Sequence, residues 1–132
     1  MSLHVTIYSF GFSRSGQPRD THGNGGGFVF DCRFLPNPVY VPHLAVLSGK
    51  DEAVIMYFLQ QDSAQQFVDR VCSMVDAAVE SYHERGYEDL QVAFGCTGGQ
   101  HRSVYCAERL TAHLRARGIT VDLRHIEEGV YW

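Results

Sequence analysis

The sequence contains no long apolar run. No stretch approaches the roughly 18 apolar residues that a membrane-spanning helix requires, and the N-terminus has no signal-peptide pattern. Both absences argue against a membrane-embedded or secreted protein. We therefore expect a cytoplasmic location.

No CxxC pair of cysteines occurs. The four cysteines are widely spaced, and the histidines form no metal-ligand grouping with them. Nothing in this spacing suggests a disulfide framework or a zinc site. We expect a reducing compartment, no metal and no cofactor.

Lysine is almost missing, since Lys50 is the only one, and the net charge is −4. This balance argues against a protein that coats nucleic acid by charge alone. Residues 100 to 125 are nevertheless locally basic, with a stripe along one side of the last expected helix: Arg102, Arg109, His113 and Arg117. The simpler interpretation is an ordinary solvated helix face, and the sequence favours it.

The remaining pattern is that of an α/β protein. With 132 residues, 45% of them hydrophobic, the chain is long enough for one domain with a real core, spanning residues 1 to 132. Ser63 and Gln66 form a capping box for a long helix that ends at Gly86. Strands are expected at 4–12, 28–34, 90–96 and 120–126, and further helices at 41–47, 51–60 and 101–117. The order predicts a single three-layer domain with a mostly parallel sheet flanked by helices.

The stretch GCTGGQHRS, residues 95 to 103, joins the third strand to the last helix. Glycines allow successive N–H groups to curl around one anion, and the helix N-terminus adds partial positive charge. A guanidinium and two hydroxyl groups suit a phosphate. The candidate phosphate-binding residues are Thr97, Gly98, Gly99, Gln100, His101, Arg102 and Ser103. A glycine turn that only caps the helix is the alternative.

Cys96 and Arg102 also follow the C-x5-R-S pattern, which resembles the loop of protein tyrosine phosphatases. In that resemblance Cys96 is the catalytic nucleophile and Arg102 the phosphate clamp. Gly95 stands where such loops carry a histidine, and no WPD-like acid loop is visible. The alternative for Cys96 is a small apolar residue at the end of a buried strand.

A second resemblance covers most of the chain. SFGF (9–12), FDCRFLPNP (30–38), GKD (49–51), GCTGGQHRSVYCAERL (95–110) and RH (124–125) resemble, in order, the C-terminal domain of the RapZ/YvcJ family. Only this resemblance explains FDCRFLPNP. It implies a fold like a phosphofructokinase subdomain. Longer family members carry an N-terminal P-loop domain; no GxxxxGKS or GxxxxGKT motif occurs here, so we expect a stand-alone or excised domain.

The resemblance also implies a function and a site. Family members of the RapZ type sense glucosamine-6-phosphate, bind small RNA and present it to an endoribonuclease, and YvcJ-type members are linked to UDP-N-acetylglucosamine. Arg33 and Asn37 would face the glycine loop across the pocket. Ser9, Arg14 and Asp31 are further candidates: Arg14 stands for the family's basic residue, and Asp31 either orients Arg33 or forms a plain ion pair with it.

We therefore expect a binding module more than an enzyme. Its predicted role is a sensor of a phosphosugar or nucleotide sugar, with RNA, an RNase or other protein, and a second copy of the chain as further partners. The alternative is a Cys-dependent phosphatase.

Overall fold

The computed structural model describes residues 3–23 and 26–132. Its sheet has four strands in the order β2-β3-β1-β4. All the pairings are parallel, with Gly11 of β1 opposite Cys96 of β3. The strands are β1 (His4–Gly11), β2 (Phe28–Asp31), β3 (Asp89–Cys96) and β4 (Thr120–His125). The expected α/β domain with a parallel sheet is confirmed.

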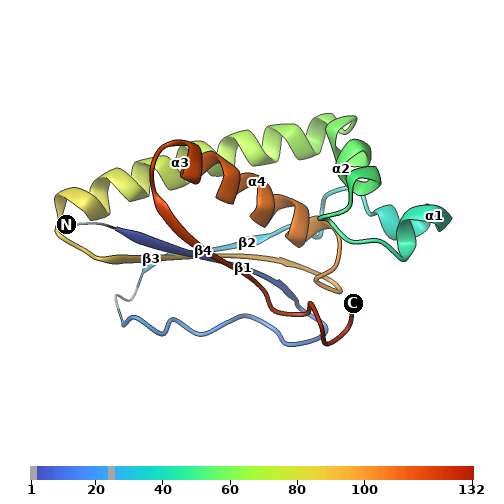
Figure 1. Cartoon of the computed structure of the whole chain (residues 1–132), viewed down its shortest axis with the longest axis horizontal. Coiled ribbons are helices and arrows are strands. Elements are labelled where there is room, and N and C mark those ends of the chain that lie inside the picture. Colours follow the sequence, from blue (N-terminus) through green and yellow to red (C-terminus); the bar gives the residue numbers. More distant parts are fainter. Residues whose placement is uncertain (1–2, 24–25) are drawn as a thin grey trace.

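The helices are η1 (Pro38–Tyr40), α1 (Pro42–Ala45), α2 (Glu52–Leu59), α3 (Asp62–Glu84) and α4 (Arg102–Ala116). Helices α3 and α4 lie side by side on one face of the sheet (Figure 1). Within the described residues, no helix combines the length and apolar character needed to cross a membrane.

The other face of the sheet is covered by the segment that follows β1, which forms no helix over residues 12 to 23 (Figure 1). Strand order explains this placement. The connection from β1 to β2 crosses the sheet in one direction, whereas those from β2 to β3 and from β3 to β4 cross in the other. Right-handed crossovers in opposite directions lie on opposite faces. The third layer is therefore a loop.

Two local expectations were wrong. Helix α3 begins at Asp62, and its N-cap is Gln61 without a side-chain bond, so Ser63 forms no capping box. Only Gln60 and Gln61 separate α2 from α3, and this short connection sets the start of the helix. The strand expected over 28–34 ends at Asp31. The short helix expected over 41–47 is present as α1, over Pro42–Ala45, and the 3-10 helix η1 precedes it.

The end of β2 has a clear physical cause. The Asp31 carboxylate accepts the backbone N–H of Arg33 at 2.9 Å, which turns the chain away from the ladder. Phe34 consequently leaves the sheet and is 66% exposed. This turn carries the FLPNP segment over the end of the sheet, toward the loop that follows β3.

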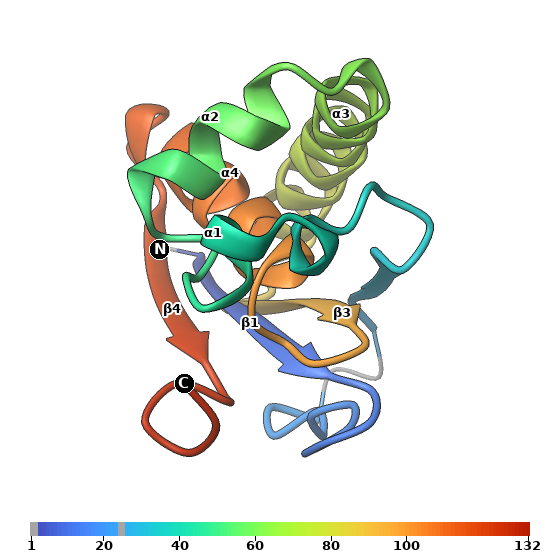
Figure 2. The same cartoon turned by 90° about the vertical axis from the view of Figure 1, so that its right-hand side faces the viewer.

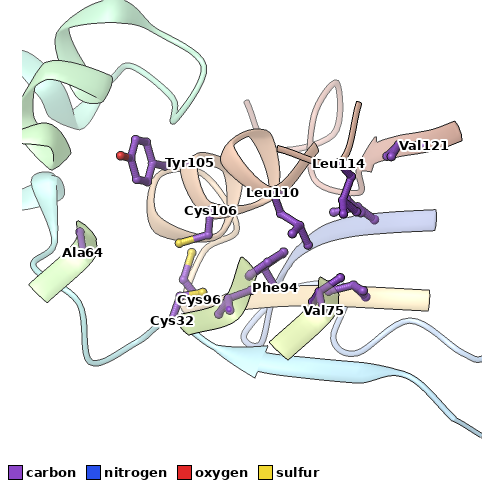
Figure 3. Close-up of a cluster of buried hydrophobic side chains, with 14 of the residues drawn as sticks. Cys32, Ala64, Val75, Phe94, Cys96, Tyr105, Cys106, Leu110, Leu114 and Val121 are labelled. Carbon is purple, nitrogen blue, oxygen red and sulfur yellow. The ribbon is translucent and has the colours of Figure 1, made fainter. Parts of the chain in front are cut away.

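The core lies between the sheet and the helices. Phe94 of β3 packs against α4, whose inner face contributes Leu110 and Leu114. Cys32, Cys96 and Cys106 are also buried there, with their sulfur atoms facing one another between the sheet and α4 (Figure 3). Burial raises the pKa of the Cys32 thiol well above its usual value, and the neighbouring Cys106 raises it further. These thiols are components of the core.

Candidate functional site

The carboxyl ends of the parallel strands meet at one end of the molecule, where the loops after β1, β3 and β4 and the helix α1 all lie (Figure 2). Ligands of open α/β sheets usually bind at this edge. A cavity of about 210 Å³ lies here, between the turn after β1, the FLPNP segment and the glycine loop. Its lining residues are Arg14, Asn37, Val39, Cys96, Thr97, Gly98, Gln100, His101 and Arg102.

The glycine loop leaves its backbone donors unused. Within the part of the chain that the structure describes, the N–H groups of Gly98, Gly99 and Gln100 donate no hydrogen bond. Helix α4 starts directly afterwards, at Arg102, and no side chain caps it. Orphan N–H groups and the helix dipole together favour an anion here.

Gly99 is required by space as well as by conformation. Its φ is +69°, and a Cβ at this position would lie 2.6 Å from Glu127 Cγ and 2.6 Å from the Gly11 nitrogen. Gly11 is equally confined, because its own Cβ would lie 2.7 Å from the Gly98 carbonyl carbon. The turn after β1 and the glycine loop therefore touch backbone to backbone.

The Arg102 guanidinium forms most of its hydrogen bonds within the protein. Its side chain reaches from α4 to the FLPNP segment, where Nη1 donates to the Arg33 carbonyl at 2.6 Å and to the Leu35 carbonyl at 3.2 Å. Nη2 lies 3.4 Å from Thr97 Oγ1, on the cavity side. The residue is only 6% exposed. Arg102 thus ties two walls of the cavity together and presents one edge of its guanidinium to the interior.

Gln100 and His101 support the loop from the other side. Gln100 Nε2 donates to the carbonyls of Ala45 and Leu47, and His101 Nε2 lies 3.0 Å from the Leu44 carbonyl. Burial lowers the pKa of His101 below its usual value. A neutral imidazole that donates from Nε2 fits this environment, so both side chains fasten α1 to the glycine loop.

The opposite wall contains Asn37 but not the Arg33 guanidinium. Asn37 caps η1, with Oδ1 accepting the Val39 N–H at 3.1 Å. Arg33 forms an ion pair with Asp31 at 2.7 Å, and its guanidinium lies 4.0 Å from the centre of the Phe12 ring. The pair is half exposed and neutralises its own charge, which favours the plain ion pair over an orienting role for Asp31.

Arg14 supplies the accessible positive charge. It is exposed on the turn after β1, and its guanidinium carbon lies 3.7 Å from the point where a Cβ on Gly98 would stand. Its other side lies over the Tyr131 ring, at 4.3 Å from the centroid. Arg14 therefore stands at the mouth of the cavity, beside the glycine loop.

Glu127 was not found from the sequence. It is fully buried, and its carboxylate accepts the N–H groups of Gly11 and Ser15, at 2.9 and 3.1 Å, and the Ser15 hydroxyl at 2.7 Å. A single glutamate near the end of the last strand carries no motif that would single it out. Its role, which is to hold the turn that carries Arg14, is visible only in three dimensions.

Cys96 faces the core. Its residue is 3% exposed, and its sulfur lies 3.1 Å from Ser103 Oγ, which is itself buried (Figure 3). The phosphatase interpretation has no support in this geometry, because the Cys96 thiol is buried against Ser103 and Arg102 is bonded to carbonyls outside the loop. Ser9 is also buried, where its hydroxyl lies 2.6 Å from His125 Nδ1. His125 Nε2 in turn lies 2.6 Å from the Glu108 carboxylate, and this contact lowers the pKa of Glu108.

The structure thus brings together part of the expected set. The following expected residues line one cavity: Asn37, Cys96, Thr97, Gly98, Gln100, His101, Arg102 and the further candidate Arg14. Five others are not among its lining residues: Ser9, Asp31, Arg33, Gly99 and Ser103. Val39 joins the lining without having been expected.

Fold and site together define a class: an α/β domain with a glycine loop and two arginines at the carboxyl edge of a parallel sheet. The chain belongs to the RapZ C-terminal domain family, whose family model matches residues 3–128. This match confirms the resemblance given by the sequence motifs.

Curated relatives are similar over nearly the whole chain. A nucleotide-binding protein of Bifidobacterium adolescentis is 45% identical over 122 residues, which are 92% of this chain and 37% of that protein. A nucleotide-binding protein of Thermotoga sp. (strain RQ2) is 43% identical over 92% of this chain and 41% of its own length. A nucleotide-binding protein of Rhodospirillum rubrum is 43% identical over 93% of this chain and 37% of its own length. The chain therefore spans well under half of these relatives.

Proposed function

We propose that this domain binds the phosphoryl group of a phosphosugar or a nucleotide sugar in the cavity between the glycine loop and the FLPNP segment. Glucosamine-6-phosphate and UDP-N-acetylglucosamine are the two candidates to test first. The observation that carries the proposal is the convergence of unpaired N–H groups at residues 98 to 100 with the guanidinium of Arg14. Relatives named as nucleotide-binding proteins support the same class of ligand.

The size of the cavity restricts how such a ligand sits. Its 210 Å³ is below the roughly 300–1,000 Å³ of pockets that enclose a drug-sized molecule. The phosphoryl end enters, and the remainder of the ligand extends along the rim. Val39 and Tyr40 are exposed at 44% and 84% on the FLPNP side, where they offer apolar surface to a sugar or base.

The charge balance at the site favours an anion. Arg14 and the inner edge of Arg102 are positive, whereas Asp31 already neutralises Arg33. The Glu127 carboxylate, whose side chain lies beside Gly99, is occupied by three donors from the turn after β1. An incoming phosphate therefore meets free donors of charged and backbone type, which give the strongest hydrogen bonds.

An RNA-adapter role stays a prediction of the family resemblance. Of the basic stripe on α4, Arg102 is buried, and His113 and Arg117 both pair with Asp76. Arg109 is the exposed member of the stripe. A gel shift with small RNA at two salt concentrations tests this role, because phosphate contacts weaken steeply with salt.

A thermal-shift screen over phosphosugars and nucleotide sugars tests the proposed function, followed by calorimetric titration. A ligand present at about 100 times its Kd stabilises the folded state by about 2.7 kcal/mol. Arg14→Ala should weaken binding roughly ten- to a hundredfold, as expected for a lost charge-assisted contact. Arg19→Ala is the matched control, since Arg19 is an exposed arginine of the same loop that does not line the cavity.

Two results would overturn the proposal. One is that no phosphorylated sugar or nucleotide sugar stabilises the wild-type protein. The other is that binding occurs but Arg14→Ala and Arg19→Ala behave alike.

A further inference from the structure

The last seven residues, 126 to 132, form a C-terminal strap beside the candidate site. The strap begins where the Ile126 N–H donates to the Ser9 carbonyl at 3.0 Å, and Glu128 pairs with Lys50 at 2.7 Å. The family model ends at residue 128. The contacts of Tyr131 and Trp132 are therefore not implied by membership of the family.

The strap fastens the turn that carries Arg14. Glu127 holds the backbone of Gly11 and Ser15, on either side of Arg14. Tyr131 then holds the Arg14 side chain itself, through the cation–π contact at 4.3 Å. A free arginine side chain samples many rotamers, and a ring against one face removes much of that freedom.

The strap also fixes the glycine loop. The indole Nε1–H of Trp132 donates to the Gly99 carbonyl at 2.9 Å. Because the peptide bond is planar and trans, a carbonyl held on one side directs the N–H of the next residue to the other side. The bond from Trp132 therefore orients the N–H of Gln100, which is one of the unpaired donors of the loop.

We propose that Tyr131 and Trp132 are positioning residues of the anion site, which set the Arg14 guanidinium and the Gln100 N–H before the ligand arrives. This inference rests on the proposed function. It assigns to the strap a share of the affinity without direct contact between the strap and the phosphate. Preorganised donors bind more tightly because less ordering is left to the moment of binding.

Calorimetric titration with inorganic phosphate and with uridine diphosphate tests the inference. Tyr131→Ala should weaken binding about two- to fivefold, the range of an exposed cation–π contact, whereas Tyr131→Phe should retain the wild-type affinity. Trp132→Phe should weaken it about two- to tenfold, as expected for one lost neutral hydrogen bond. Val130→Ala is the matched control, because Val130 is an exposed strap residue outside the cavity lining.

Coupling to Arg14 separates positioning from a structural role. In an Arg14→Ala background, Tyr131→Ala should have no further effect on the Kd, because the group that it positions is already gone. Trp132 is the only tryptophan of the chain, so its fluorescence should change during the titration with the same Kd. Both readouts use the full chain.

Each failure is distinguishable. If the wild type binds phosphate or uridine diphosphate but Tyr131→Ala and Trp132→Phe bind as tightly as Val130→Ala, the strap inference is overturned and the proposed function stands. An equal loss from Tyr131→Ala with and without Arg14 would also overturn it. If the wild type binds neither probe, both the inference and the proposed function fall.

Discussion

Replacement of Arg102 by alanine distinguishes a structural role of this residue from a role in ligand binding alone. If the guanidinium waited for a phosphate, its removal would leave the stability of the unliganded protein unchanged. In the structure it already donates to the carbonyls of Arg33 and Leu35, and it is 6% exposed. We therefore expect Arg102→Ala to destabilise the protein in the absence of any ligand.

The magnitude follows from the two carbonyls. Hydrogen bonds from charged groups contribute about 1.5–3 kcal/mol each. The Arg33 carbonyl belongs to an exposed residue and recovers water, whereas Leu35 is buried and its carbonyl loses its partner. A total near 3 kcal/mol is expected, which for a domain of this size lowers Tm by about 10 °C. The Tm of Arg102→Lys should lie between those of the wild type and Arg102→Ala, since one ammonium group cannot reproduce the planar guanidinium.

Differential scanning calorimetry of the unliganded proteins measures this effect. Arg109→Ala is the matched control, because Arg109 is an exposed arginine on the same helix, and its replacement should change stability by less than about 0.5 kcal/mol. An Arg102→Ala protein that melts at the same temperature as Arg109→Ala would refute the structural role derived from these bonds.

Three further outcomes follow from the structure. Gly99→Ala should lower stability by several kcal/mol, because its Cβ would collide with Glu127 and its φ is positive. Gly98→Ala is the control: no atom lies nearer than 3.7 Å to its Cβ position, so it should melt close to the wild type in the same calorimetry. His101 has a pKa below its ordinary value of 6.5, so the folded state should lose stability as pH falls through 6.5 toward the folded pKa. Denaturant titrations at several pH values should show a smaller loss of unfolding free energy in His101→Gln. The same dependence of unfolding free energy on pH in both proteins would contradict this assignment. With a generic aryl phosphate, we expect the wild type and Cys96→Ser to show the same rate of hydrolysis, because the thiol lies in the core. A rate that is lost in Cys96→Ser would support the phosphatase interpretation.

Strong local patterns made much of the fold predictable. The apolar run of β3 and the helical spacing in α3 and α4 identify elements whose bounds agree with the structure to within one or two residues. Boundaries that depend on tertiary contacts were not predictable. The early end of β2 depends on Asp31 and on the carbonyls taken by Arg102, and the start of α3 depends on a connection of two residues.

The candidate site was predictable only where one short segment supplies it. The GCTGGQHRS motif locates the glycine loop and its free N–H groups without knowledge of any partner. The sequence does not reveal that the side chains of Gln100 and His101 form hydrogen bonds to backbone carbonyls of α1. Glu127 and Tyr131 were missed because their roles arise from contacts with the turn after β1, more than 110 residues away.

Binding of a phosphoryl group to the loop at residues 97 to 102 can be observed amide by amide in an NMR titration. Two-dimensional ¹H–¹⁵N spectra of the protein would be recorded with increasing phosphate, glucosamine-6-phosphate and UDP-N-acetylglucosamine. We expect the largest saturable shifts at the amides of Gly98, Gly99 and Gln100, and smaller shifts at Arg14. Saturable shifts centred instead on the larger cavity of about 630 Å³ beside His83 and Ile119, or no saturable shift with any of the three compounds, would contradict it.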